Sequence, residues 1–329
     1  MRDQSAHRIW LPPLPPVIEL SALPGLSGAD DAGAVSPAVD QGSLRAPIGI
    51  IDRPYYQRQD ELIIDLTQHG GHMALCGGPQ SGKSSALRTI VSALALRHDP
   101  QAARFYVIDL GGGQLASLER LPHVAGVAGR EEGEKVRRIV DEVAGFIRRP
   151  ERCATFLVID GWHHIGTSNA EFEDIAEKVT EIVADGASAH VHVIIATSRW
   201  TTMRPAIRDL IANRLELRLG EALDSLIDRK LQQKLPSAPG HGLTLMGENM
   251  LLARTSNQDI AHICRVHAEA QPVPQLKMLP AVLTPAALAA QGDVPAREIA
   301  WGIGGRDLDT LTWNPVSYTH LRAHETRED

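Results

Sequence analysis

The sequence predicts an α/β fold in which a mainly parallel sheet is covered by helices on both faces. Three observations carry this prediction. Short runs of β-branched and other apolar residues recur without polar alternation, which is typical of strands buried on both faces. Stretches with helical spacing of apolar residues separate these runs, as in chains of βαβ units. A glycine-rich segment joins one such run directly to a helical stretch.

The expected strands are short and apolar. The run Thr155–Ile159 is the clearest of them, because its continuous apolar character suits a strand inside a sheet. The full set of expected strands is Leu62–Leu66, His72–Cys76, Arg104–Asp109, Ala154–Asp160, His190–Thr197 and Leu215–Leu219. Helical patterns fill the intervals at Lys83–Arg97, Glu132–Arg148, Phe172–Ala187 and Leu223–Gln232.

Composition divides the chain into a central domain and two connectors. Residues 1–45 are expected to form a Pro-rich linker, since the run Trp10–Pro16 favours an extended polyproline-like conformation. Two behaviours stay open for this linker: docking into a groove of a neighbouring domain, or a solvated terminus. The central domain is expected at 46–270, and a second linker, rich in Pro and Ala, at 271–296.

The C-terminal part echoes the start of the central domain. Ile299–Ile303 resembles Ala46–Ile50, so residues 297–314 are expected to begin a further, truncated module. Residues 315–329 are polar and lack periodicity. Because Ser317–Asp329 resembles a translated adapter from sequencing reads, we expect a non-native tail there that is not part of the fold.

Bulk properties narrow the possible classes of protein. The chain has 329 residues, 43% of them hydrophobic and 22% charged, which is enough for one sizeable core. The sequence contains no apolar run of membrane-spanning length and no signal pattern. We therefore expect a cytoplasmic location, at the inner face of the cell membrane if a partner or a missing N-terminal part recruits the chain.

Charge and cysteine content add two expectations. The net charge of −7 disfavours DNA binding, because a duplex-DNA binder usually carries a basic patch or stripe. Cys76, Cys153 and Cys264 are odd in number and lack metal-ligand spacing. Cys76 and Cys153 adjoin strand-like runs and are expected to be small buried residues, and none of the three cysteines implies a disulfide framework.

The strongest motif is Gly77-Gly78-Pro79-Gln80-Ser81-Gly82-Lys83-Ser84, which satisfies the P-loop pattern G-x-x-x-x-G-K-[ST]. Its glycines let successive amides face a phosphate, and the following helix adds the positive end of its dipole. Lys83 supplies a positive charge to the β- and γ-phosphates of ATP. The residues expected to bind the nucleotide are Gly77, Gly78, Pro79, Gln80, Ser81, Gly82, Lys83, Ser84 and Ser85.

A second motif, Phe156–Asp160, has the form of a Walker B strand: four apolar residues that end in a carboxylate. At the carboxyl end of a buried strand beside the P-loop, Asp160 would hold Mg²⁺ together with the Ser84 hydroxyl. Such a run is weak evidence alone, and its pairing with the P-loop gives it weight. The predicted cofactors are therefore ATP and Mg²⁺.

The residue after Asp160 bears on catalysis. Efficient ATPases with a P-loop and a Walker B strand usually carry a glutamate there, whereas this chain has Gly161. General-base assistance is typically worth about 10²–10⁴-fold in rate. We expect firm ATP binding with slow or absent hydrolysis, and we expect Gly161→Glu to raise turnover. Glu171 or Glu173 are substitutes that the spacing does not favour.

Other polar residues near strand ends have two interpretations each. Thr197 is a candidate sensor of the γ-phosphate or a simple strand cap. Arg204, with Arg199 and Arg208 nearby, is a candidate arginine finger acting on a neighbouring module, although ion pairing is the commoner role of an arginine.

The segment just after Asp160 also carries unusual side chains. His163 and His164 lack the neighbours that a zinc site needs and are expected to be loop residues. Trp162 is either a core residue or a contact for a partner.

Several further motifs resemble the FtsK/SpoIIIE family of P-loop NTPases, which have a RecA/FtsK-like fold. The likeness covers most of residues 46–255, so an FtsK-type ATPase domain is expected at 46–270. It rests on Val107–Asp109 with Leu115 and Leu121–Val124, and on Arg204-Pro205, Asn213-Arg214, Asp224-Ser225 and Asp228.

Within that family the chain looks most like the second ATPase domain of EccC-type (EccCb) proteins of type VII (ESX) secretion. This likeness rests on Gly77–Ser84, Gly111–Gly113, Asp160–Trp162, Arg199-Trp200 and Arg204–Leu210. It implies a string of ATPase domains that recognise secreted substrates at a membrane core complex. It also implies that the second domain serves mainly as a regulatory nucleotide binder.

Three functions stay open on the sequence alone. The first is a nucleotide-binding module of a protein-export motor. The second is an FtsK-like DNA translocase, which the net charge, Gly161 and the lack of a visible winged-helix domain disfavour. The third is an interaction module in which ATP is a structural ligand.

Overall fold

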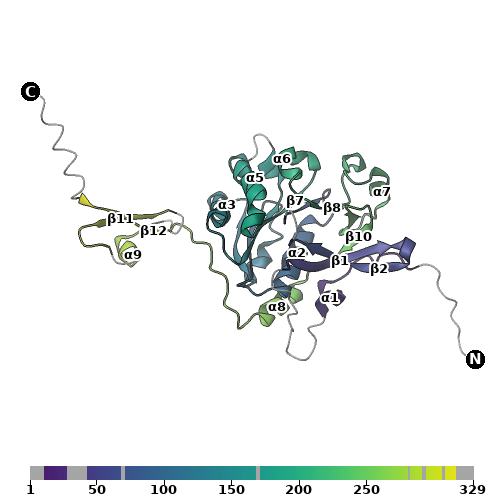
Figure 1. The fold of residues 1–329 in the computed structure, drawn as a ribbon, viewed down its shortest axis with the longest axis horizontal. Coiled ribbons are helices and arrows are strands. Elements are labelled where there is room, and N and C mark those ends of the chain that lie inside the picture. The colour runs from purple at the N-terminus through teal and green to yellow at the C-terminus, as the bar shows by residue number, and fades with distance from the viewer. Residues whose placement is uncertain are drawn as a thin grey trace, which may run out of the picture. The chain divides into compact units, whose positions relative to one another are not determined.

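The computed structural model describes residues 11–27, 43–67, 71–167, 171–280, 282–290, 294–305 and 308–315. The chain divides into two compact units, Met1–Gln275 and Leu276–Asp329. The larger unit contains a ten-stranded sheet with the order β2-β1-β10-β9-β8-β3-β7-β6-β4-β5, and the smaller contains a two-stranded hairpin (Figure 1).

The centre of the large sheet is parallel, as predicted. It consists of β8 (Asn213–Leu217), β3 (Met73–Cys76), β7 (Val191–Thr197), β6 (Ala154–Asp160), β4 (Ala103–Asp109) and β5 (Val124–Gly129). Every residue of β4, β6 and β7 is buried, which explains their continuous apolar runs. The edge strand β5 was not predicted, because its alanines and glycines give little β signal.

Four antiparallel strands extend the sheet beyond β8. They are β9 (His241–Thr244), β10 (Asn249–Leu252), β1 (Arg45–Arg53) and β2 (Arg58–Asp65). The predicted strand Leu62–Leu66 is the second half of β2. The short strands β9 and β10 were missed, since each has only four residues.

Three of the predicted helices form close to their expected positions: α2 (Lys83–Arg97), α3 (Gly133–Arg148) and α5 (Ala176–Asp185). A further helix, α8 (Asn257–Val266), was not predicted. It begins at a capping box in which the Ser256 hydroxyl accepts from Asp259 N.

The predicted helix Leu223–Gln232 is wrong. A 3₁₀ turn at Ala222–Asp224 precedes a short helix, α7 (Arg229–Lys234). Between them the Ser225 hydroxyl accepts from the backbone amides of Ile227 and Asp228, at 3.1 Å each. These hydrogen bonds to a side chain take the place of helical backbone hydrogen bonds, because serine hydroxyls compete for nearby backbone groups.

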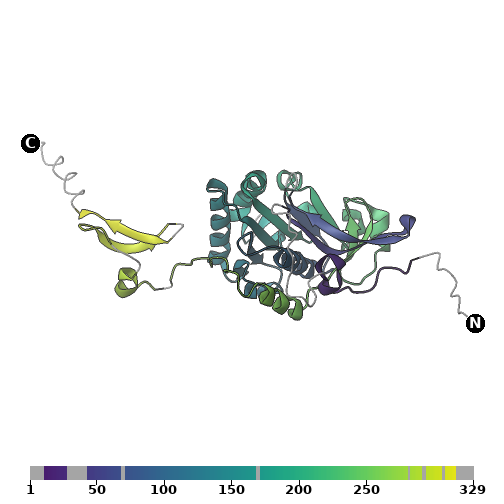
Figure 2. The same ribbon diagram turned by 60° about the horizontal axis from the view of Figure 1, so that its bottom comes forward.

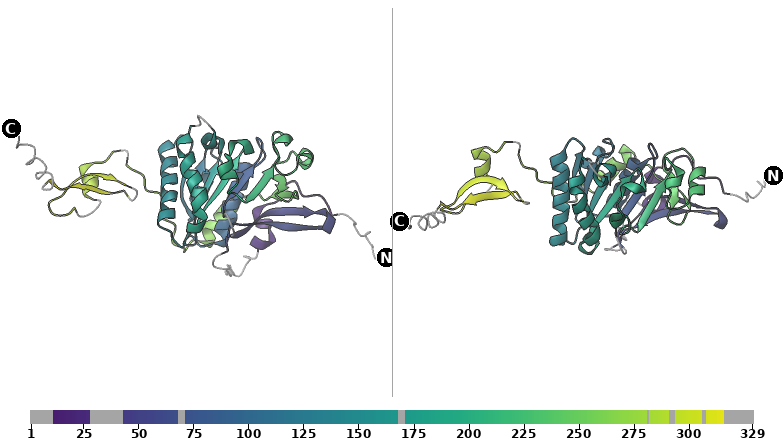
Figure 3. Two further views of the ribbon diagram at one scale, coloured as in Figure 1. Left: turned by 45° about the horizontal axis from the view of Figure 1, so that its top comes forward. Right: turned by 90° about the horizontal axis from the view of Figure 1, so that it is seen from above.

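Helices cover both faces of the parallel centre. Along β4, Phe105 and Val107 belong to the core that α2 and α8 complete, whereas the ring of Tyr106 meets Phe146 of α3. On that second face α3 packs against α5, which Figures 1 and 3 show side by side. Figure 2 shows α8 along the face covered by α2. Alternate side chains of the strand thus pack against helices on opposite faces of the sheet, which confirms the predicted fold class.

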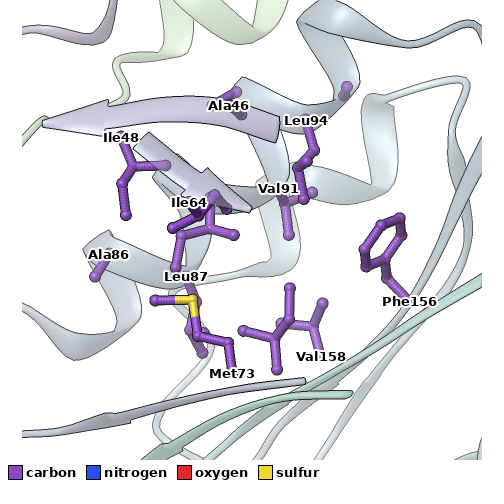
Figure 4. Close-up of a cluster of buried hydrophobic side chains, with 14 of the residues drawn as sticks. Ala46, Ile48, Ile64, Met73, Ala86, Leu87, Val91, Leu94, Phe156 and Val158 are labelled. Carbon is purple, nitrogen blue, oxygen red and sulfur yellow. The ribbon is translucent and has the colours of Figure 1, made fainter. Parts of the chain in front are cut away.

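Helix α2 lies within the hydrophobic core of the larger unit. Leu87 and Val91 point toward Met73, Phe156 and Val158 of the sheet in Figure 4. The hairpin β1–β2 covers the other side of α2 with Ala46, Ile48 and Ile64, so α2 is buried along most of its length. Full burial of one such aliphatic side chain contributes about 1.5–3 kcal/mol. The core therefore fixes the helix that follows the P-loop.

Parts of both expected linkers pack against the larger unit. Leu20 and Leu23 are fully buried, and the backbone of this segment pairs with that of Arg254. At the other linker, Val273 N donates to Pro122 O at 2.9 Å, beside the edge strand β5. Trp10, on which the docking hypothesis for the first linker partly rests, lies outside the described residues.

The smaller unit consists of α9 (Pro285–Ala289), β11 (Ile299–Gly304) and β12 (Asp309–Trp313). Its hairpin shares a detail with β1–β2. The register shifts between Ala300 and Gly302 in one and between Pro47 and Gly49 in the other, at matching positions of the two similar segments. The expected tail falls largely on residues 316–329, outside the described residues.

Among the described residues, every helix is too short or too polar to pass through a bilayer.

Two buried histidines make the stability of the fold sensitive to acid. His72 Nδ1 accepts from Val193 N at 3.0 Å, and His192 Nδ1 donates to Gly71 O at 2.8 Å. Burial lowers the pKa of both side chains to about 4 from the ordinary 6.5. The unfolded chain therefore binds protons that the folded chain rejects, and stability falls as the pH drops from 6.5 toward 4.

We expect each of these histidines to remove about 3 kcal/mol of unfolding free energy across that interval. Urea unfolding at pH 7.5, 6.0 and 5.0 measures the slope. His72→Gln should reduce the slope of unfolding free energy against pH by the equivalent of about one bound proton. This holds whatever the substitution does to the stability at pH 7.5. An unchanged slope in that variant would show that His72 is protonated in the folded state.

Candidate nucleotide-binding site

The P-loop joins β3 to α2 at the carboxyl edge of the sheet. Two of its residues have left-handed backbone: Gln80 at φ +57° and Gly82 at φ +98°. A side chain at Gly82 would place its Cβ 3.0 Å from Gly240 N, so only glycine fits this turn comfortably. The turn ends at the first residue of α2. The free amides of that helix thus face the space that a phosphate would occupy.

Backbone hydrogen bonds from three neighbouring segments hold the loop. Gly77 N donates to Thr197 O at the end of β7, at 3.1 Å. Gly78 N donates to Arg218 O just beyond β8, at 2.8 Å. Gly240 N, before β9, donates to Ser81 O at 2.9 Å. The shape of the P-loop therefore depends on segments far away in the sequence.

Lys83 is the first residue of α2, and its side chain is half-buried. Its Nζ donates to Gly78 O at 2.7 Å, which holds the ammonium over the loop. Burial lowers the pKa of Lys83, and the nearby carboxylate of Asp160 partly opposes this. Phosphate oxygens would stabilise the charged ammonium in the same way.

Ser84 and Asp160 meet directly. The Ser84 hydroxyl donates to Asp160 Oδ2 at 2.5 Å, and Asp160 is only 1% exposed. Burial raises the pKa of Asp160, while the hydrogen bond from Ser84 works against that rise. A hydroxyl and a carboxylate are oxygen ligands of the kind that Mg²⁺ prefers. These two residues fit the predicted metal site and would hold the ion.

The glycine-rich loop after β4 packs against the Asp160 carboxylate. A Cβ at Gly111 would lie 2.5 Å from Asp160 Oδ2. Asp109 folds this loop, because its carboxylate accepts from Gly111 N at 3.2 Å and from Leu115 N at 2.7 Å. Both elements resemble the family's motifs, but no role for them at the site was predicted from the sequence.

Gly161 has a backbone conformation that residues with a side chain rarely adopt. Its φ is +80°, and an added Cβ would lie 3.0 Å from the carbonyl carbon of Leu110 and 3.2 Å from Gly111 N. The conformation of this loop thus favours glycine at position 161 and disfavours a glutamate there. This geometry argues against the expectation that Gly161→Glu raises turnover, and the effect of that substitution stays a prediction.

The two other glutamates considered as substitutes are engaged in ion pairs. Glu171 pairs with Arg130 at 2.7 Å, and Glu173 pairs with Arg204 at 3.6 Å. Arg204 itself is about half exposed. Of its neighbours, Arg199 pairs with Asp224 at 3.7 Å and Arg208 with Asp209 at 3.5 Å. A finger role for Arg204 stays a prediction.

Thr197 ends β7 and is fully buried. Its hydroxyl lies 2.7 Å from the Thr202 hydroxyl and donates to Arg199 O at 3.2 Å. These contacts shape the loop after β7, and the sensor role stays a prediction. The Thr197 carbonyl, not its hydroxyl, makes the contact with the P-loop.

The residues after Gly161 differ in their surroundings. Trp162 is a core residue whose Nε1 donates to Thr202 O at 3.1 Å. His163 and His164 were expected in a loop, but they form the start of the short helix α4 (His163–Gly166), with their ring centroids 4.1 Å apart. Within the described part of the chain, no three His, Cys, Asp or Glu side chains form a group that could hold a metal ion.

A buried polar network beside the P-loop was not predicted from the sequence. Glu216 of β8 is fully buried and hydrogen-bonded to Trp200, Ser225, Leu226 and Gln232. A charged residue inside the otherwise apolar stretch Leu215–Leu217 was the available signal, because an acid is rarely buried without dedicated partners.

Similarity to known sequences points to one family of ATPases. The model of the FtsK/SpoIIIE family matches residues 39–272. The ESX secretion system protein EccC of Thermomonospora curvata is 35% identical over 350 residues, which cover 93% of this chain and 26% of the relative. EccC4, an ESX-4 secretion system protein of Mycobacterium tuberculosis, is 36% identical over 96% of this chain and 27% of its own length. The chain thus spans about a quarter of these relatives.

Solved structures give the same result. The cytoplasmic domain of the type VII secretion ATPase EccC from T. curvata has a TM-score of 0.80 at 33% identity, over 94% of this chain and 40% of that one. ATPases 2 and 3 of that protein, solved with a signal sequence peptide, have a TM-score of 0.77 at 33% identity, over 93% and 62%. The sequence motifs, the P-loop geometry and these similarities agree that the chain belongs to the FtsK/SpoIIIE family and is similar to its EccC members.

Proposed function

We propose that this chain is an ATP-binding module of a type VII secretion motor, and that it couples nucleotide and substrate binding to protein export. The observation that carries the proposal is the convergence of Lys83, Ser84 and Asp160 at the P-loop. When bound, Mg²⁺ would neutralise phosphate charge. The chain's own part is to present loop amides and the Lys83 ammonium to the phosphates, with Ser84 and Asp160 on the metal.

The same site supports slow hydrolysis. An efficient site needs a carboxylate or another base that orients the attacking water. Gly161 supplies none, and Glu171 and Glu173 are held in ion pairs on the surface. The module would therefore act mainly through its nucleotide-bound and nucleotide-free states, as a regulatory ATPase domain.

The proposed partners follow from the relatives. One similar structure contains two ATPase domains with a signal sequence peptide, which supports neighbouring ATPase domains and secreted type VII substrates as partners. The relatives are named as ESX secretion proteins, which supports work at a membrane core complex from the cytoplasmic side. We also propose that residues 297–314 begin a second module, because β11–β12 repeats the register shift of β1–β2.

Lys83→Ala tests the site. We expect saturable binding of a fluorescent ATP analogue in magnesium buffer to the unchanged chain, and at least about tenfold weaker binding to the variant, because a charged hydrogen bond is worth about 1.5–3 kcal/mol. The melting temperature should change little, since the one hydrogen bond of the Lys83 ammonium within the described part of the chain is to the loop carbonyl of Gly78.

Lys178→Ala serves as the matched control, because that lysine forms a surface pair with Asp141 on the helical layer. Equal affinity of the Lys83 variant and the unchanged chain would remove the P-loop assignment. Turnover that rises strongly with double-stranded DNA would favour the DNA translocase. Binding without any change in turnover or assembly on adding a signal peptide would favour a structural role for ATP.

Gly161→Glu should lower stability without raising turnover. The left-handed backbone and the close approach of Leu110 make any side chain there cost about 1–3 kcal/mol. Gly161→Ala is the control, because it adds the Cβ without the carboxylate. Chemical denaturation and phosphate release of both variants are compared. A glutamate variant that turns over faster while the alanine variant does not would mean that the missing base alone limits the rate.

A further inference from the structure

Glu216 lies on β8, one strand from the P-loop strand β3, and is 0% exposed. Its two carboxylate oxygens accept four hydrogen bonds. Trp200 Nε1 donates at 2.7 Å and Leu226 N at 2.8 Å to Oε1. Ser225 Oγ donates at 2.6 Å and Gln232 Nε2 at 3.0 Å to Oε2. All four partners donate, which is the pattern that suits an ionised carboxylate.

The charge of this carboxylate is balanced by neutral donors. Glu216 takes part in no ion pair with another described residue. Buried charges without hydrogen-bond partners are very costly, so the four donors must stay in place while the carboxylate is ionised. Glu216 therefore fixes the positions of the donors as much as they stabilise it.

The donors belong to segments that shape the nucleotide site. Trp200 lies in the loop after β7, whose last carbonyl, from Thr197, accepts the Gly77 amide of the P-loop. Ser225, Leu226 and Gln232 lie in the segment 221–235, which leads from β8 to α7 and on toward β9.

Gln232 continues the network to the backbone that touches the P-loop. Its Oε1 accepts from Leu219 N at 3.1 Å, and its Nε2 also donates to Leu217 O at 3.1 Å. Gly220, the residue after Leu219, packs so closely on the P-loop that a Cβ added at Gly78 would lie 2.6 Å from Gly220 N. Gly78 N in turn donates to Arg218 O. An unbroken path of contacts thus joins Glu216 to the P-loop.

We propose that Glu216 is a positioning residue that locks the segment 221–235 to the P-loop, so that nucleotide occupancy of the loop controls the order of this segment. The inference rests on the proposed nucleotide binding. Glu216 does not touch the nucleotide site itself and acts through Gln232, Leu219 and Gly220 on one side and through the Trp200 loop on the other.

Glu216→Gln is the sharpest test, because it keeps the shape and changes the hydrogen bonding. An amide accepts at its oxygen only and donates from its nitrogen. Either the donors of Trp200 and Leu226 or those of Ser225 and Gln232 then face an NH₂ group, which cannot accept their hydrogen bonds. If Gln232 turns to accept, it gives up the bond from Leu219 N, which is the link toward Gly220.

The full chain is studied with and without a magnesium complex of a non-hydrolysable ATP analogue, by binding titration and by hydrogen exchange read peptide by peptide. In the unchanged chain we expect the analogue to slow exchange in residues 77–85 and in residues 221–235. In Glu216→Gln we expect at least tenfold weaker binding and, at saturation, protection of residues 77–85 without protection of residues 221–235.

Glu248→Gln is the matched control, since Glu248 pairs with Arg53 outside the network and should leave both readouts unchanged. Trp200→Phe removes one donor and should give a smaller effect of the same kind, which keeps the test valid if Glu216→Gln does not fold. If the variants lose stability but residues 221–235 remain protected at saturation, Glu216 is merely structural and the proposal is wrong.

Failure of the inference and failure of the proposed function look different. A chain that takes up no analogue at all refutes nucleotide binding. A chain that binds it and protects residues 77–85, but never residues 221–235, retains the proposed function and refutes the coupling.

Discussion

The P-loop turn between β3 and α2 is the constraint on which the rest of the site depends. The turn needs left-handed backbone at Gln80 and Gly82, and it lies so close to the Gly240 backbone that an added Cβ at Gly82 would be 3.0 Å from Gly240 N. It holds only because α2 is fixed in the core and because the ends of β7 and β8 accept its amides. The phosphate-binding shape is therefore a property of the whole larger unit, not of eight residues.

How far the sequence predicted this site follows from the range of the interactions. The P-loop and the Walker B strand are local patterns, so Lys83, Ser84 and Asp160 could be predicted from the sequence, and the structure brings them together. Gly161 was seen as a missing glutamate, yet it has a left-handed backbone and lies against Leu110 and Gly111 of the loop after β4, which no local pattern encodes. Glu216 was missed, because its donors lie up to 16 residues away and meet only in the fold.

The fold shows the same division. The buried parallel strands were predicted because burial on both faces leaves a continuous apolar run, as in β6. The short strands β9 and β10 exist through pairing with β8 and β1, which no local pattern encodes. The segment Leu223–Gln232 has helical periodicity, but the Ser225 hydroxyl and the Glu216 carboxylate draw its backbone into a turn. Tertiary hydrogen bonds there outweigh a helix propensity worth only tenths of a kcal/mol per residue.

Charge around the site explains why nucleotide and metal would act together. Asp109, Asp160 and Glu216 are all buried near the carboxyl edge, and Asp109 adds to the rise in the pKa of Asp160. Against these acids the loop offers the single ammonium of Lys83, whose own pKa burial lowers. A triphosphate entering such a surrounding meets more negative than positive charge. A divalent cation on Ser84 and Asp160 would offset this excess of negative charge, which is a physical reason to expect that nucleotide and metal bind together.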